Sequence, residues 1–103
     1  MLNLISAAFI KARQENRPAL LTYTVAGDSS NKQSLEILKS ISNYADILEV
    51  GVPHNTPVAD GGQIQTSAYR AIKNGIKMND VFNIVKNFRK SKYSKPVILM
   101  GYY

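Results

Sequence analysis

Apolar positions recur along the chain with two spacings, one typical of helices and one typical of strands. In the first segment Leu4, Ala8 and Ala12 fall on one helical face, and three later segments repeat this spacing. The predicted helices are 3–15, 32–44, about 64–74 and 79–91. Short runs rich in β-branched and aromatic residues predict strands between them. The predicted strands are 20–25, 46–50 and 96–100.

The order of these elements is helix, strand, helix, strand, helix, helix, strand. Strands that alternate with helices favour right-handed βαβ units and a parallel sheet, so the expected fold class is α/β. The sequence stops at Gly101-Tyr102-Tyr103, directly after the third strand. A parallel sheet normally has helices on both faces. We therefore expect residues 1–103 to form a single, incomplete domain.

Composition narrows the class of protein further. The chain is 45% hydrophobic and 19% charged, which is ordinary for one folded domain. Its apolar runs are far shorter than the ~18 residues of a membrane span, so no membrane association is expected and a cytoplasmic protein is the default. With no cysteine and one histidine, disulfides and a zinc cluster are not expected. We expect no metal and no cofactor.

The formal net charge of +6 raises the question of nucleic-acid binding. The basic residues are spread along the chain, and the densest group, 86–95, lies at a predicted helix end. Cations there complement the exposed helix carbonyls. The charge therefore favours an ordinary solvated surface, and no nucleic-acid partner is expected.

Two carboxylates stand out as candidate chemistry. Glu49 interrupts an apolar strand, where an ionised carboxylate is costly unless it is paired or lines a cavity. Asp60 lies eleven positions further on, in the loop 51–62, which holds two prolines and three glycines. General acid–base catalysis commonly uses carboxylates held in a cleft. The alternatives are an ion pair between Glu49 and a lysine, and a helix-capping role for Asp60.

Several separated blocks resemble one known family, the tryptophan synthase alpha chain, whose fold is a (β/α)8 barrel. The blocks are Ala26-Gly27-Asp28, Leu48-Glu49-Val50-Gly51-Val52-Pro53, Pro57-Val58-Ala59-Asp60-Gly61, Ile64-Gln65, Arg70-Ala71 and Leu99-Met100-Gly101-Tyr102-Tyr103. The resemblance covers essentially the whole chain. Since such barrels usually have about 250 residues, it implies a partial TIM barrel with the first three strands.

The resemblance also implies an activity and a set of site residues. The reaction is the retro-aldol cleavage of indole-3-glycerol phosphate to indole and glyceraldehyde 3-phosphate, a lyase step of tryptophan biosynthesis. The position of Glu49 is the family's general acid–base, and that of Asp60 accepts a hydrogen bond from the indole N–H group. The positions matching the lining of the indole pocket are Tyr23, Ile64, Met100 and Tyr102.

The family's partner is the tryptophan synthase beta chain, in an alpha2beta2 tetramer. Thr56 replaces an aspartate that the family uses near that interface, so coupling to the partner is in question. Three β/α units without a phosphate site imply little or no activity for this chain alone. The alternative is a non-catalytic fragment that docks on the beta chain. We expect Asp28 to cap the helix that follows it.

Overall fold

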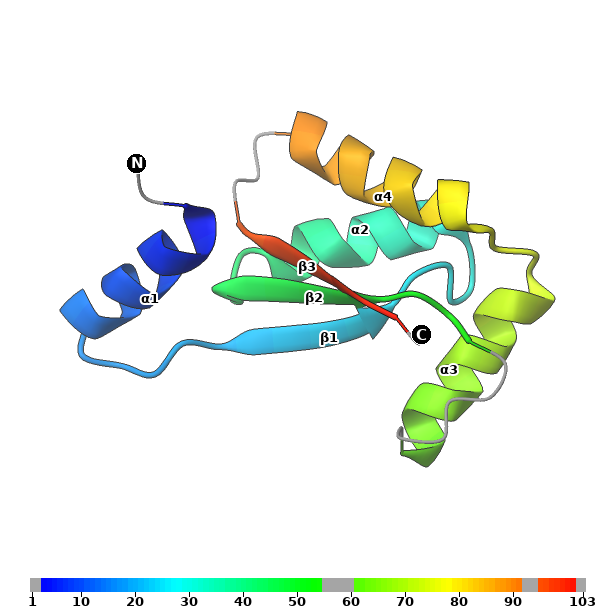
Figure 1. Ribbon diagram of the computed structural model, residues 1–103, viewed down its shortest axis with the longest axis horizontal. Coiled ribbons are helices and arrows are strands. Elements are labelled where there is room, and N and C mark those ends of the chain that lie inside the picture. Colours follow the sequence, from blue (N-terminus) through cyan, green and yellow to red (C-terminus); the bar gives the residue numbers. More distant parts are fainter. Residues whose placement is uncertain (1–2, 55–60, 92–94, 102–103) are drawn as a thin grey trace.

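The computed structural model describes residues 3–54, 61–91 and 95–101. Its helices and strands follow the predicted order (Figure 1). They are α1 (Leu4–Gln14), β1 (Leu21–Val25), α2 (Asn31–Ile41), β2 (Ile47–Gly51), α3 (Gly62–Lys73), α4 (Met78–Lys90) and β3 (Val97–Met100). Because each predicted element is present, the helix and strand assignment from the sequence is confirmed.

The three strands form a parallel sheet with the order β1-β2-β3. In its register Tyr23 pairs with Glu49, and Glu49 pairs with Ile98. Paired residues on neighbouring strands project to the same side of a sheet, and successive residues alternate between the two sides. The sheet therefore presents two chemically different faces, one through Leu48 and Val50 and the other through Glu49.

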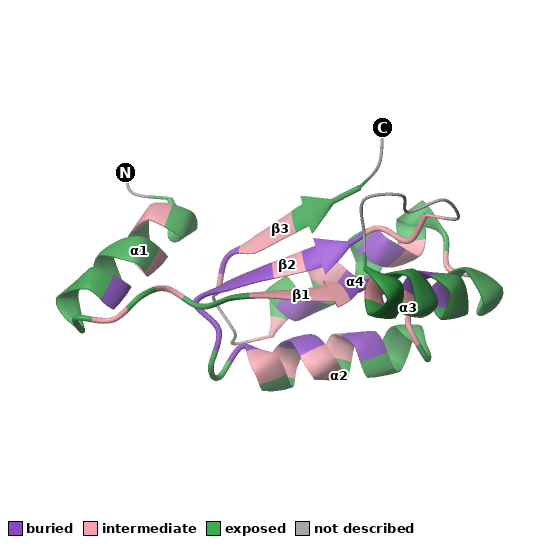
Figure 2. Ribbon diagram, turned by 90° about the horizontal axis from the view of Figure 1, so that it is seen from below, coloured by how far each residue is buried: buried purple, intermediate pink, exposed green. Residues whose placement is uncertain are grey.

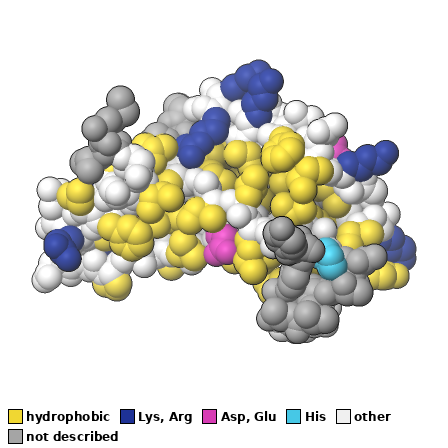
Figure 3. All heavy atoms as spheres, in the orientation of Figure 1, with side chains coloured by type: hydrophobic (Ala, Val, Ile, Leu, Met, Phe, Trp, Pro, Cys, Tyr) yellow, Lys and Arg dark blue, Asp and Glu magenta, His cyan; other side chains and the backbone are white. Residues whose placement is uncertain are grey.

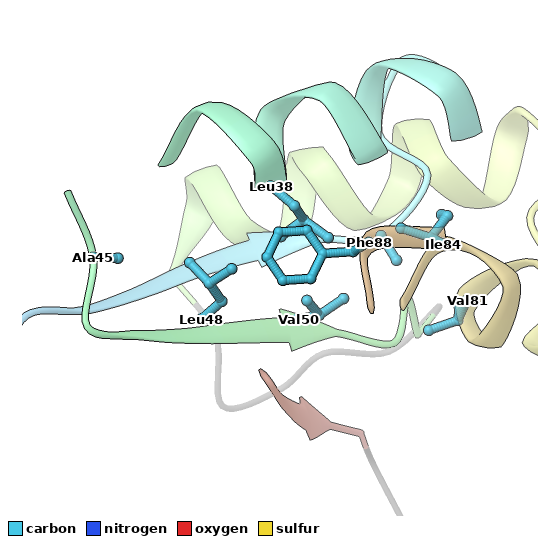
Figure 4. Close-up of a cluster of buried hydrophobic side chains, with 8 residues drawn as sticks. Leu38, Ala45, Leu48, Val50, Val81, Ile84 and Phe88 are labelled. Atoms are coloured by element: carbon cyan, nitrogen blue, oxygen red, sulfur yellow. The ribbon is translucent and has the colours of Figure 1, made fainter. Parts of the chain in front are cut away.

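The face of Leu48 and Val50 carries the main core beneath α2 and α4 (Figure 4). Leu38 from α2 and Phe88 from α4 close over these strand side chains and are almost fully buried. Each large apolar side chain buried in this way stabilises the fold by roughly 1.5–3 kcal/mol. The apolar faces that the sequence pattern predicted for α2 and α4 are the faces that pack here.

The opposite face of the sheet is partly open within the described residues: Val25 and Ile47 are buried on it, whereas Tyr23, Glu49 and Ile98 are half-buried. Figure 2 shows half-buried and exposed segments in β1 and β3 and a largely buried β2. Leu21 and Met100 are 47% and 38% exposed at its two ends. Strand β3 is half-buried at its start and exposed at its end. The three strands thus form one wall of an α/β fold.

Two helix ends show how local sequence set the boundaries. Helix α2 ends at Ile41, three residues before the predicted end, because Ser42 turns the chain and its hydroxyl donates to the Lys39 carbonyl. Helix α3 ends as predicted beside Gly75, whose φ is +86°. There Gly75 N–H donates to Ile72, and Ile76 N–H donates to Ala71. These two bonds form a Schellman motif, which favours glycine at this position.

The start of the sheet is tied together by a buried ion pair. Arg17 donates two hydrogen bonds to Asp46, at 2.8 and 2.9 Å, and Leu20 N–H donates a third at 2.7 Å. The Asp46 side chain is 4% exposed. The Arg17 guanidinium, followed by the Leu20 N–H group, holds the pKa of Asp46 well below its usual range. This pair fixes the segment before β1 to the start of β2.

Candidate functional site

Glu49 lies in the middle of the open face. Its strand neighbours Leu48 and Val50 are buried on the other side, whereas Glu49 is half-buried. It stands in a row between Tyr23 of β1 and Ile98 of β3. Within the described residues no lysine or arginine forms an ion pair with Glu49. The alternative of a paired strand-end carboxylate therefore finds no support in this part of the chain.

The surroundings of Glu49 are largely apolar. Figure 3 shows this side of the molecule, where hydrophobic side chains spread over the strands and acidic atoms lie among them. A carboxylate on an apolar wall can exchange a proton with a bound ligand while the wall contacts the ligand's apolar part. The arrangement suits a flat, apolar molecule with a proton to gain or lose.

Gly51 makes room for Tyr23 beside Glu49. A Cβ atom on Gly51 would lie 2.6 Å from Cζ of the Tyr23 ring, closer than any real contact. Gly51 is two residues after Glu49 and projects to the same face. The aromatic ring therefore rests on the end of β2, next to the carboxylate. The sequence marked Gly51 only as part of a motif, because its role depends on the neighbouring strand.

Helix α3 brings Ile64 to the same end of the sheet. Ile64 and Tyr23 both pack against a second, smaller cluster, which contains Val25, Ala68 and Ala71. Met100 completes the group, since it pairs with Gly51 at the end of β3. Four predicted site residues thus gather where the strands end. They are Tyr23, Glu49, Ile64 and Met100. Their roles toward a substrate remain predictions.

Two predicted site residues, Asp60 and Tyr102, lie outside the described residues, as does Thr56. The structure does describe the start of the helix that follows Asp60. Gly61 is the N-cap of α3, and none of the side chains that the structure describes caps this helix end. The catalytic assignment of Asp60 therefore rests on the family resemblance.

The prediction that Asp28 caps the following helix is wrong. Ser30 is the N-cap of α2, and its side chain accepts a hydrogen bond from Gln33 N–H at 3.0 Å. Asp28 instead accepts two hydrogen bonds from Arg70, both 2.8 Å, and one from the Ser67 hydroxyl at 2.5 Å. The Arg70 guanidinium and then the Ser67 hydroxyl lower the pKa of Asp28, against the opposing effect of burial.

Sequence reasoning missed Ser67 and Arg70 as partners of Asp28. Their spacing of three residues on a predicted helix was a usable signal, because it places both on one face. Their target lies 39 and 42 positions earlier in the chain. Only the packing of α3 against β1 brings the three side chains together.

The described residues contain no cluster of three histidine, aspartate or glutamate side chains placed to hold a metal ion. Among the same residues, no helix combines the length and apolarity needed to cross a membrane. The chemistry available at the candidate site is that of a carboxylate, an aromatic ring and aliphatic side chains.

Comparison with known proteins places this chain in a family. The family model for the tryptophan synthase alpha chain matches residues 9–103. Over 102 residues the chain is 76% identical to the tryptophan synthase alpha chain of Pelagibacter ubique, covering 99% of this chain and 38% of that one. The chain therefore spans less than half the length of this relative.

Solved structures similar to this chain point to the same family. The alpha subunit of tryptophan synthase from Legionella pneumophila matches with a TM-score of 0.92 at 35% identity, covering 99% of this chain and 39% of that one. A chain of the tryptophan synthase complex from Pyrococcus furiosus matches with a TM-score of 0.79 at 45% identity, covering 82% and 35%. These neighbours are TIM barrels, so the predicted partial barrel fold is confirmed. The chain belongs to the tryptophan synthase alpha chain family.

Proposed function

We propose that this chain supplies the first three β/α units of a lyase that cleaves indole-3-glycerol phosphate to indole and glyceraldehyde 3-phosphate. The observation that carries the proposal is the position of Glu49. It is a half-buried carboxylate beside Tyr23 on an open apolar face, near the carboxyl ends of parallel strands. Active sites of (β/α)8 barrels lie at this end of the strands.

In the proposed reaction Glu49 moves two protons. As an acid it first delivers a proton to the indole ring carbon that carries the glycerol chain, and positive charge then builds on the ring nitrogen. As the resulting carboxylate it removes the proton from a hydroxyl of the glycerol chain. That oxygen becomes the aldehyde oxygen, the bond between the chain and the ring carbon breaks, and its electrons neutralise the ring nitrogen. Asp60 accepts a hydrogen bond from the indole N–H group, and this bond strengthens as positive charge builds on nitrogen. It therefore favours the transition state over the ground state.

The remaining predicted side chains hold the indole ring. Tyr23, Ile64, Met100 and Tyr102 supply aromatic and aliphatic surface, which binds a flat apolar ring without fixing a charge. The phosphate of the substrate needs a separate site, which such barrels usually build after strands seven and eight. Because phosphate binding helps to position the reacting bonds, the 103-residue chain alone should have little or no activity.

The proposal is tested in a hybrid protein. Residues 1–103 replace the matching segment of the Pelagibacter ubique relative, and release of indole from indole-3-glycerol phosphate is measured. We expect turnover in the hybrid and none above background in the 103-residue chain. Changing Glu49→Gln should lower kcat by about 10²-fold or more, because a neutral amide cannot transfer protons.

Glu36→Gln is the matched control, because Glu36 is an exposed glutamate on α2 whose ion-pair partner, Lys39, is 4.0 Å away. It should leave kcat within about twofold, as expected for a surface pair. A Glu49→Gln hybrid that turns over as fast as the Glu36→Gln hybrid would remove Glu49 from the mechanism and the proposal with it.

A second candidate function is docking on a tryptophan synthase beta chain, in the cytoplasm, without catalysis. It is favoured by the similarity to a chain of the Pyrococcus furiosus complex. Gel filtration of the 103-residue chain with the Pelagibacter beta chain tests it. Co-elution at micromolar concentration would support docking, and separate elution would exclude it for this chain.

A further inference from the structure

Helix α3 stands apart from the main core of the protein. Figures 1 and 2 show it across the carboxyl end of β1, away from α2 and α4. Its buried residues, Ala68 and Ala71, contact Val25 in the second cluster and take no part in the core around Phe88. Two buried alanines and the half-buried Ile64 form a small apolar interface, which defines the position of the helix only loosely.

A set of polar contacts adds to this small apolar interface and fixes the position of α3. Arg70 donates hydrogen bonds to both carboxylate oxygens of Asp28, and the Ser67 hydroxyl donates to one of them. At the C-cap of α3, Asn74 donates from its side chain to the Ser29 carbonyl at 2.8 Å. The donors at 67, 70 and 74 share one helical face, so the contacts hold the second half of α3 and its C-terminal end.

The loop that carries Asp28 is itself fixed. Gly27 has a φ of +82°, and a Cβ atom there would lie 3.0 Å from Cβ of Ile76, just beyond the end of α3. Gly27 N–H also donates to the buried Ser34 hydroxyl at 3.2 Å. The carboxylate thus projects from a loop that is anchored to α2, and the bidentate geometry with Arg70 is directional.

The position of α3 matters because of Ile64. This residue lies on the first turn of α3 and, like Tyr23, packs against the second cluster. A tilt or slide of α3 would therefore move Ile64 relative to Tyr23 while the main core stays unchanged. Both side chains belong to the predicted indole pocket.

We infer that Asp28 and Arg70 form a positioning pair that sets one wall of the substrate pocket by holding Ile64 of α3 against Tyr23 of β1. The inference rests on the proposed function, since it concerns the same pocket. Neither residue touches the reacting atoms in this role. Because the wall contacts the indole ring in ground and transition state alike, its loss should appear in KM more than in kcat.

The first measurement does not depend on activity. Amide hydrogen exchange is compared between the unaltered protein, Asp28→Asn and Arg70→Gln, in both the 103-residue chain and the hybrid. We expect the amides of 66–73 in α3 to exchange about tenfold faster in each variant, and those of α4 to change less than twofold. The double variant should exchange no faster than the faster single one, because the two residues act through each other.

The second measurement uses turnover of the hybrid. Asp28→Asn should raise KM for indole-3-glycerol phosphate about tenfold and leave kcat within about threefold. General destabilisation would give a different pattern, since a smaller folded fraction lowers apparent kcat and leaves KM unchanged. The matched control is the surface pair on α2, removed by Glu36→Gln and Lys39→Gln, which should change neither quantity.

Three results would overturn the inference. The first is unchanged exchange in α3, the second is equal acceleration in α3 and α4, and the third is a normal KM in a variant whose α3 has loosened. A hybrid without turnover would contradict the proposed function instead. Exchange would then decide whether the pair holds α3 at all.

Discussion

Two bidentate arginine–aspartate pairs tie the ends of the sheet, and they differ in burial. At the amino end, the Asp46 side chain is 4% exposed and that of Arg17 is 36% exposed. At the carboxyl end, the Asp28 side chain is 23% exposed and that of Arg70 is 56% exposed. The first pair joins the segment before β1 to the start of β2, whereas the second holds a separate helix.

This difference in burial parallels the different roles of the two ends of the strands in this kind of fold. In (β/α)8 barrels the amino ends of the strands serve stability and the carboxyl ends carry the chemistry. An ion pair whose carboxylate is buried and fully hydrogen-bonded resists opening, because breaking it leaves polar groups without hydrogen-bond partners. A more exposed pair costs less to break, so it can set the place of a pocket wall without being essential for folding. The predictions below test this contrast.

The largest effect is expected at the amino end. Asp46→Ala leaves Arg17 and the Leu20 N–H group without their carboxylate, so we expect a loss of about 3 kcal/mol in the free energy of unfolding. The loss is measured by urea denaturation, and activity per folded hybrid molecule should not change. Glu15→Gln, which removes the exposed partner of Arg17, should cost less than about 1 kcal/mol. If the two variants lost the same free energy of unfolding, the buried and the exposed contacts of Arg17 would not differ in their contribution to stability.

A smaller loss is expected at the carboxyl end, where Gly51→Ala forces a methyl group into the Tyr23 ring. Overpacking of this kind costs about 2 kcal/mol, and it should also displace Tyr23 from Glu49 and lower turnover in the hybrid. Gly62→Ala is the matched control, because none of the residues in 3–54, 61–91 and 95–101 lies within 4 Å of a Cβ atom there. If both variants unfold at the same urea concentration, the contact between Tyr23 and Gly51 is not a constraint.

The smallest effect concerns pH. The pKa values of Asp46 and Asp28 are both lowered in the folded state. Groups with lowered pKa values add stability above their unfolded pKa of about 3.9, and this stability is lost as pH falls toward the folded pKa. For Asp46 the loss between pH 5 and pH 3 should be about 1 kcal/mol.

Urea midpoints measured across that range check the pH prediction. Asp46→Asn should flatten the pH dependence clearly, and Asp28→Asn should flatten it less, because the Asp28 side chain is more exposed to solvent than that of Asp46. A urea midpoint that depends more steeply on pH in either variant would show that the replaced carboxylate is not the group that titrates.

The sequence by itself determined the elements and their order. Apolar spacing marked α4, the β-branched runs marked the strands, and Asn74-Gly75 marked the end of α3. These signals are local, since each depends on residues within one or two turns of the chain. The family motif was also local, because Glu49 and Gly51 stand in one short block.

Only the tertiary structure decided which of these residues act together. It placed Glu49 on the open face, set the Tyr23 ring on Gly51, and turned Asp28 from the expected helix cap into the partner of Arg70. A capping role for Asp28 was the reasonable expectation from nearby residues, but Ser30 is the residue that caps α2. Contacts between residues about 40 positions apart depend on how strands and helices pack, and no local pattern encodes that packing.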